Sequence, residues 1–219
     1  NPVTNFDKIF EKMIRTNIMK SFPNDGIIGE EFKDKKSKNN NYWIIDPIDG
    51  TKAFVAGLPT WSNLVGMTHK KKSIIGMANF PELKKTYISY NNLSYSIEKK
   101  IKKRLKTNNQ TNISKSKIFC SFHNQNKNLK YFKKLNKLNK NVSKITLDAF
   151  SYCLLAEGKV DAVIESDLKI YDVAAIIPIV ENSGGFITTW NNKNAENSGN
   201  ILATSNKKLH NKLLKLLNS

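Results

Sequence analysis

The sequence has little of what marks a secreted or membrane-bound protein. Its 219 residues contain two cysteines, Cys120 and Cys153, both in apolar surroundings, so no disulfide framework is expected. No apolar run approaches the roughly 20 residues that a membrane span needs, and no secretory hydrophobic segment opens the sequence. With 39% hydrophobic residues, the chain is also too apolar to be disordered. We therefore expect a single globular domain in the reducing cytoplasm, with no membrane partner.

Arginine is scarce, although the chain is strongly basic. Of 36 basic residues only Arg15 and Arg104 are arginine, and 18 acids leave a net charge of +18. Such a charge suggests nucleic acid as a partner. Nucleic-acid readers favour the bidentate fork of arginine, however, and these lysines are spread among many asparagines. We therefore expect no nucleic-acid partner; a basic nucleic-acid-binding protein is the non-enzyme alternative, with the Lys-rich residues 99–106 as its best contact.

Histidine is rare as well. His69, His123 and His210 are far apart, and neither cysteine joins them in a zinc-binding spacing. We expect these histidines to be surface or packing residues rather than metal ligands.

The most informative stretch is residues 42–51, Tyr-Trp-Ile-Ile-Asp-Pro-Ile-Asp-Gly-Thr. Its aromatic and β-branched start is typical of a buried strand, and Pro47 has no N–H to continue a sheet ladder, so the chain is expected to leave the sheet at Asp46. A tight turn would then bring Asp46, Asp49 and the carbonyl of Ile48 towards one point. Hard divalent cations bind to such a cluster of oxygen atoms.

The end of this stretch could serve a phosphate. Gly50 allows the backbone to approach a ligand closely, and the N–H groups of Gly50 and Thr51 could bind phosphate if they open a helix. The residues alone leave an ordinary surface turn equally open, because Asp, Pro and Gly are common turn residues.

Three motifs in order resemble those of the inositol monophosphatase family of metal-dependent sugar phosphatases. The resemblance runs from Pro2-Val3-Thr4 to the C-terminal helix, and it is closest to the histidinol-phosphatase branch over residues 25–32, 49–66 and 171–185. The motifs are Gly29-Glu30-Glu31, Asp46-Pro47-Ile48-Asp49-Gly50-Thr51, and Tyr171-Asp172-Val173-Ala174-Ala175 followed by Gly184-Gly185.

The resemblance implies a site for two or three Mg²⁺ ions. Glu30, Asp46 and the Ile48 carbonyl would hold one ion, and Asp46, Asp49 and Asp172 would hold a second. Asp172 has a competing interpretation as the N-cap of a helix over residues 173–181, because Asp is favoured at that position.

The resemblance also implies that water attacks the phosphate. Thr51, oriented by Asp7, and Glu30 would position and deprotonate that water, while the N–H groups of Gly50 and Thr51 would hold phosphate oxygens. Asp7 could instead form a capping pair with Thr4 at the start of a helix. Glu31 could support the site or be a solvated acid.

Two further acids indicate the substrate. By resemblance, Glu165 contacts the organic part of the substrate, beside Asp49 and Asp172, and Asp148 falls where the histidinol-phosphatase branch places an acid. Two acids suit a cation, so L-histidinol phosphate is the expected substrate; an inositol 1-phosphate or another sugar or nucleotide phosphate is the alternative. Asp148 could also be an N-cap, and Glu165 a surface acid at a strand end.

The periodicity predicts an α/β (α+β) fold, which by resemblance is the layered αβαβα sandwich of this family. An amphipathic helix is expected over residues 4–22, with its apolar positions at Phe6, Ile9, Phe10, Met13, Ile14 and Ile18. Residues 1–90 would form an N-terminal half that includes an antiparallel meander of strands 62–68, 73–80 and 85–90. A solvated linker over 91–116 and a half of alternating strands and helices over 117–219 would follow, with one strand near 143–147 and another over 160–165.

One departure from the family concerns the start of the sequence. Family members usually have a further helix before the segment that matches Pro2-Val3-Thr4, and it is missing here. A trimmed chain and a naturally short protein would both look like this. The difference bears on helix packing and on the homodimer that the resemblance implies more than on the metal ligands.

Overall fold

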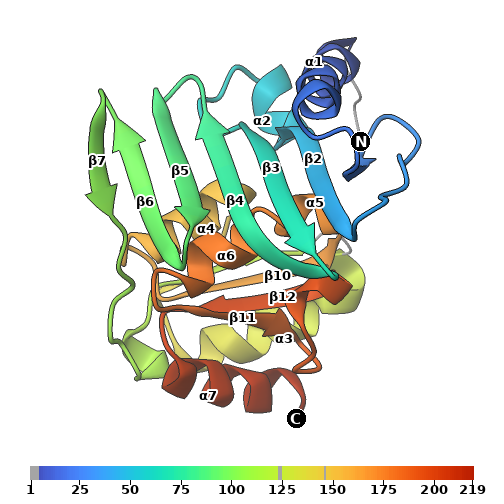
Figure 1. Cartoon of the computed structure of the whole chain (residues 1–219). Helices are drawn as coiled ribbons and strands as arrows, with labels where there is room; N and C mark the ends of the chain where they lie inside the picture. Colours follow the sequence, from blue (N-terminus) through green and yellow to red (C-terminus); the bar gives the residue numbers. More distant parts are fainter. Residues whose placement is uncertain (1–4, 123–124, 146) are drawn as a thin grey trace.

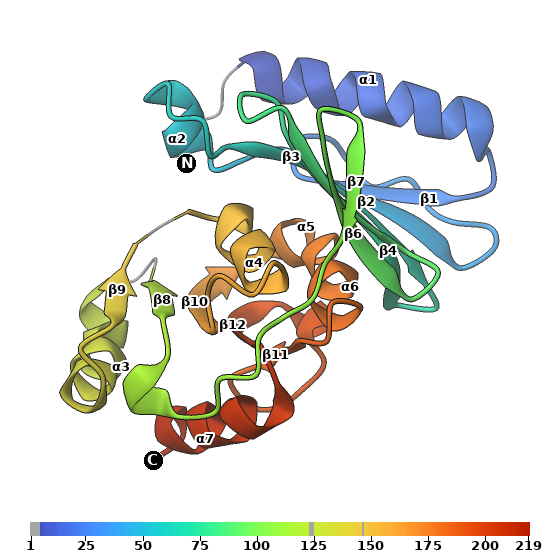
Figure 2. The same ribbon diagram turned by 90° about the vertical axis from the view of Figure 1, so that its left-hand side faces the viewer.

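Two β-sheets with helices between and outside them make up the fold (Figure 1). The computed structural model describes residues 5–122, 125–145 and 147–219. Figure 2 shows the layers edge-on, which confirms the expected αβαβα sandwich. In the described ranges no helix is long and apolar enough to cross a bilayer. The outer helix on one side is α1 (Asn5–Ser21); the middle layer is α4 (Ala149–Ala156), α5 (Ile170–Val173) and α6 (Ile176–Glu181); the other outer layer is α3 (Gln125–Leu138) and α7 (Lys207–Leu217).

The first sheet has seven strands in sequence order, and only its first pair is parallel. The predicted meander is confirmed, but the solvated linker predicted over 91–116 is wrong in its first part, because two more strands continue the meander there. The strands are β1 (Gly26–Gly29), β2 (Asn41–Asp49), β3 (Ser62–His69), β4 (Lys72–Phe80), β5 (Lys85–Tyr90), β6 (Leu93–Glu98) and β7 (Ile101–Arg104), and the short helix α2 (Thr51–Val55) follows β2.

The second sheet has five strands in the order β11-β12-β10-β8-β9. β10 runs parallel to β8 and antiparallel to β12. The predicted strand near 143–147 is shorter than expected, and Thr146 lies outside the described residues. The strands are β8 (Ile118–Ser121), β9 (Val142–Lys144), β10 (Ala162–Leu168), β11 (Phe186–Thr189) and β12 (Gly199–Thr204), and two short 3-10 helices are η1 (Ile113–Lys115) and η2 (Ala195–Asn197).

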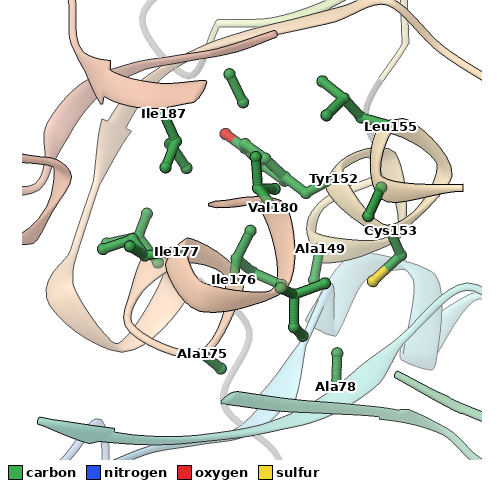
Figure 3. Packing of buried hydrophobic residues seen from close by; sticks show 14 of the residues in the cluster. Ala78, Ala149, Tyr152, Cys153, Leu155, Ala175, Ile176, Ile177, Val180 and Ile187 are labelled. Carbon is green, nitrogen blue, oxygen red and sulfur yellow. The ribbon is translucent and has the colours of Figure 1, made fainter. Parts of the chain in front are cut away.

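The main hydrophobic core lies between the two sheets, around α4 and α6 (Figure 3). The middle helices come very close to the first sheet, and two glycines in that sheet make this possible. A Cβ atom on Gly76 would lie 1.9 Å from the carbonyl oxygen of Ala175, and one on Gly66 would lie 2.8 Å from the N atom of the same residue. Any larger side chain would push the middle layer away from β3 and β4, and with it the preceding helix α5.

Helix α1 packs on the sheet through Ile14 and Ile18 of the expected apolar face, and also through polar residues that the apolar spacing did not predict. Its buried residues are Asp7, Glu11, Arg15 and Ile18. Phe6, Ile9 and Met13 from the expected apolar face are 53%, 50% and 59% exposed. Thr4, the expected capping partner of Asp7, lies outside the described residues.

Candidate active site

Two acids lie at the end of β2, at the edge of the first sheet. Asp46 and Asp49 are 2% and 7% exposed. The chain does not leave the sheet at Asp46 as predicted: β2 continues to Asp49 through a register irregularity, and Asp49 pairs with Ser62. The N–H of Ile48 donates to Asp46 Oδ1 over 3.1 Å, so the turn itself fixes that carboxylate.

Asp172 joins these two acids from the middle layer. Carboxylate oxygens of Asp46, Asp49 and Asp172 lie within 4.8 Å of one another. The single helix predicted over 173–181 is wrong, because the chain forms two short helices here, and Asp172 is the third residue of α5 rather than the residue before a helix. Its Oδ2 accepts the N–H of Lys169, which anchors the carboxylate at the start of α5.

Glu30 directly follows β1, which pairs in parallel with β2, so both strands deliver acids to the same edge of the sheet. Glu30 lines one cleft together with the three aspartates. Burial, followed by repulsion from Asp172 and Glu31, raises the pKa of Glu30 to about 7. The acids of the three distant motifs therefore line one cleft, and their roles as metal ligands stay a prediction.

The electrostatics of this cluster favour the binding of a cation. Burial, followed by repulsion from Asp49 and Glu30, raises the pKa of Asp46 well above its usual value. Burial, followed by repulsion from Asp148, does the same for the pKa of Asp49. A divalent cation would remove this penalty, and every side-chain donor in the cluster is a carboxylate oxygen, which suits a hard cation such as Mg²⁺. The residues present therefore fit the expected metal site.

Gly50 and Thr51 follow at the start of α2. Gly50 has φ 79°, a left-handed conformation that favours glycine, and a Cβ there would lie 2.9 Å from Asp148 Oδ2. The Thr51 hydroxyl donates to the Ile48 carbonyl over 3.2 Å. Asp7 is buried and its charge contributes to raising the pKa of Glu30, so it lies near the site; its role in orienting Thr51 stays a prediction.

Asp148 occupies a tight turn before α4. The N–H of Phe150 donates to the Leu147 carbonyl over 2.9 Å, and Asp148 between them has φ 46° and ψ −134°. These angles resemble the first central position of a type II′ turn, which strongly favours glycine. Asp148 is the N-cap residue of α4, as the alternative interpretation placed it, but its side chain makes no cap hydrogen bond; the N–H of Ala149 donates to Asp49 Oδ2.

Glu165 lies inside β10 and is 2% exposed, so its interpretation as a surface acid at a strand end is wrong. The hydroxyl of Tyr152 donates to its Oε2 over 2.9 Å. Glu165, Asp148 and Tyr152 all line the same cleft as the metal-binding acids, which has a volume of about 430 Å³.

Sequence reasoning missed two groups of residues around the site. Glu11 and Arg15 form a buried ion pair on α1, and the Glu11 carboxylate also accepts the N–H of Glu31 over 2.7 Å. Their spacing of four residues was a usable signal for a helical ion pair. Tyr152 gave no such signal, because its partner Glu165 belongs to a different element.

The histidines and cysteines play no part in the cleft as far as the structure describes them. His69 is exposed, whereas His210 is buried and bonds to the hydroxyls of Thr188 and Thr204. His123 lies outside the described residues. Cys120 and Cys153 are buried free thiols.

Comparison with known proteins gives consistent matches over nearly the whole chain. The statistical model of the inositol monophosphatase family matches residues 1–219. The chain is 32% identical over 212 residues to the bifunctional phosphatase IMPL2, chloroplastic, of Arabidopsis thaliana, covering 94% of this chain but only 60% of that protein's length. It is 29% identical over 222 residues to a histidinol-phosphatase of Mycobacterium tuberculosis, covering 100% of this chain and 85% of that protein. Its fold matches an inositol monophosphatase from Zymomonas mobilis with a TM-score of 0.86 at 25% identity, covering 97% of this chain and 83% of the other.

Proposed function

The chain belongs to the inositol monophosphatase family, whose members are phosphatases, and we propose that it is a magnesium-dependent phosphomonoesterase that prefers L-histidinol phosphate. The observation that carries the substrate proposal is the position of two further acids, Asp148 and Glu165, in the same cleft as the metal-binding acids. Histidinol phosphate has an amine and an imidazole beyond its phosphate, and these can be cations. An inositol phosphate offers only hydroxyl groups there.

The metal part of the proposal assigns each acid to a site. Glu30, Asp46 and the Ile48 carbonyl would hold one Mg²⁺, and Asp46, Asp49 and Asp172 would hold a second. The proposal covers two or three ions, and it assigns ligands to these two. When bound, the ions supply positive charge to the phosphate and lower the pKa of a water molecule. The raised pKa values of Asp46 and Asp49 support this assignment, since a bound cation would stabilise the ionised form of each carboxylate.

The residues of the chain would then act on water and phosphate. Glu30 would accept a proton from the attacking water, and the Thr51 hydroxyl, held by Asp7, would orient it. The N–H groups of Gly50 and Thr51 would donate to phosphate oxygens where the left-handed Gly50 lets the backbone approach. Asp148 and Glu165, beside Asp49 and Asp172, would bind the cationic organic part.

The alternative substrate within the family is an inositol 1-phosphate or another sugar or nucleotide phosphate. Its support is the likeness to the inositol monophosphatase of known structure. Such a substrate would offer no cation to Asp148.

A substrate panel tests the proposal. Turnover with added Mg²⁺ would be measured on histidinol phosphate, inositol 1-phosphate, glycerol phosphate and a bisphosphorylated nucleotide. We expect kcat/KM to be highest for histidinol phosphate. A higher value for inositol 1-phosphate or the nucleotide would contradict the proposed substrate while leaving the phosphatase assignment intact.

A further inference from the structure

A single helix organises the two acids that lie beyond the metal cluster. Asp148 immediately precedes α4, and Tyr152 is in the first turns of the same helix. The hydroxyl of Tyr152 donates to Glu165 Oε2 over 2.9 Å, and both side chains are 2% exposed. Glu165 itself is fixed in the middle of the second sheet, where its backbone pairs with Ser121 on one side and Ile201 on the other.

The direction of this hydrogen bond is determined by its surroundings. Burial, followed by the charge of Glu165, raises the pKa of Tyr152 well above its usual value, so the hydroxyl keeps its proton. Tyr152 is therefore the donor, and the Glu165 oxygen accepts. The tyrosine ring extends from α4 into the main core (Figure 3), which leaves its hydroxyl little freedom to move. One oxygen of Glu165 is thus held in place.

We propose that Tyr152 is a positioning residue for substrate selection: its hydroxyl holds the Glu165 carboxylate in a fixed orientation, so that the cleft selects phosphate monoesters with a cationic organic group. This inference rests on the proposed function and deepens it. Tyr152 acts through Glu165 and takes no part in the phosphoryl chemistry.

A second tyrosine-glutamate pair shows what a purely structural pair looks like in this chain. The hydroxyl of buried Tyr87 donates to Glu157 Oε1 over 3.0 Å. Lys85 and Lys159 both form ion pairs with Glu157, so its charge is neutralised within the protein. Glu165 instead shares its cleft with Asp49 and Asp148, and its charge contributes to raising the pKa of Asp49. The negative charge concentrated there suits a cationic ligand.

The test compares Tyr152→Phe with the matched control Tyr87→Phe. Each variant loses one buried hydroxyl that donates to a glutamate, so both should lose similar thermal stability. The readout is the ratio of kcat/KM for histidinol phosphate to kcat/KM for glycerol phosphate, which has no cation. We expect this ratio to fall about three- to tenfold in Tyr152→Phe, mainly through KM for histidinol phosphate, because a hydrogen bond to a charged group is lost from the subsite. Tyr87→Phe should keep the ratio of the wild type.

A double-mutant cycle with Glu165→Gln separates positioning from general loss of structure. If Tyr152 acts through Glu165, adding Tyr152→Phe to Glu165→Gln should lower the ratio by less than about twofold further. Inhibition of glycerol phosphate turnover by free histidinol gives a readout without histidinol phosphate turnover, and its inhibition constant should rise in Tyr152→Phe. Should that variant not fold, the same constant in Glu165→Gln still decides whether the subsite binds a cation.

The outcomes also distinguish this inference from the proposed function. A wild-type enzyme with no preference for histidinol phosphate over glycerol phosphate would overturn both. If the wild type and Tyr152→Phe prefer histidinol phosphate equally, only the positioning role is overturned. The same holds if the losses in the kcat/KM ratio from Tyr152→Phe and Glu165→Gln simply add in the double variant. An unchanged inhibition constant for histidinol in Glu165→Gln would overturn it as well.

Discussion

Asp49 Oδ2 accepts a hydrogen bond from the backbone N–H of Ala149 over 2.9 Å, although the two residues are 100 positions apart in the chain. The bond joins the end of β2, where the metal-binding acids lie, to the first residue of α4. The same oxygen also accepts the hydroxyl of Ser62 over 3.2 Å. The metal cluster and the acids beyond it are therefore connected by hydrogen bonds, and a substitution in one group should also affect the other.

The first prediction concerns the metal ligands. Asp172→Asn and Asp49→Asn each remove an anionic oxygen and barely alter shape, so we expect activity with Mg²⁺ to fall by about a hundredfold or more. Activity assays with Mg²⁺ and with chelator, and metal titration by calorimetry, provide the measurement. Full activity of the wild type in chelator would contradict the metal-dependent mechanism.

The second prediction concerns pH in the absence of metal. Burial and neighbouring acids raise the pKa of Glu30 from 4.5 to about 7 in the folded protein. Below pH 4.5 the carboxyl is protonated in both the folded and unfolded states, and the stabilising effect of keeping it neutral is fully present. As the pH rises through 7 that effect is lost, so the melting temperature in chelator should fall over this window.

Two comparisons check the origin of this dependence of melting temperature on pH, whose steepness is called the slope below. Glu30→Gln should have a shallower slope than the wild type in chelator, because the group that titrates is gone. Saturating Mg²⁺ should also reduce the slope, because the cation stabilises the ionised carboxylates. A melting temperature that rises from pH 5 to pH 7 in chelator would mean that another group dominates.

The third prediction uses the strained backbone of Asp148. Its φ of 46° and ψ of −134° favour glycine, and a strained position costs on the order of 1–3 kcal/mol. Asp148→Gly should therefore be more stable than Asp148→Ala by about 1–2 kcal/mol in the free energy of unfolding, measured by denaturant titration. Both variants should lose kcat/KM for histidinol phosphate by about ten- to a hundredfold, because the charge-assisted contact is gone.

A matched pair of variants separates strain from charge here. If the two variants are equally stable, the turn is not strained; if glycerol phosphate turnover falls as much as histidinol phosphate turnover, Asp148 supports the metals rather than the organic group. Asp148→Asn, which places another residue common in type II′ turns there and keeps the size of the side chain, should lose selectivity with the smallest change in stability.

The fourth prediction concerns the support of Glu30 by α1. Glu11 is fully buried, pairs with Arg15 over 2.6 Å and accepts the N–H of Glu31. Removing its charge in Glu11→Gln should cost about 3–5 kcal/mol of unfolding free energy, since the Arg15 guanidinium stays buried without an anionic partner. Because Glu31 directly follows Glu30, the affinity for Mg²⁺ should also fall.

Glu157→Gln is the control for this prediction. It breaks the ion pair with Lys85, which lies away from the cleft, and should lower stability while leaving Mg²⁺ affinity unchanged. If Glu11→Gln lowers only stability, the ion pair on α1 supports the fold and not the metal site.

The sequence by itself determined the chemical identity of the site. Asp46 and Asp49 are so close along the chain that one turn brings their carboxylates together, and the motifs with Glu30 and Asp172 supplied the other two acids. The order of most strands and helices also followed from local periodicity, because alternating and helical patterns depend only on neighbouring residues.

Only the tertiary structure decided which polar residues are buried. Residues 91–104 were too polar to indicate strands, yet Ser94 in β6 is buried because its hydroxyl bonds to the Pro178 carbonyl in α6. The apolar spacing of α1 likewise located only part of its buried face: Ile14 and Ile18 do pack on the sheet. Glu11 and Arg15 are buried as well, because they find their partners in residues 31–33. A polar group can be buried when a partner satisfies it, and that partner is supplied by another element far along the chain. The link from Asp49 to Ala149 and the link from Tyr152 to Glu165 have the same origin, which is why local sequence patterns could not predict them.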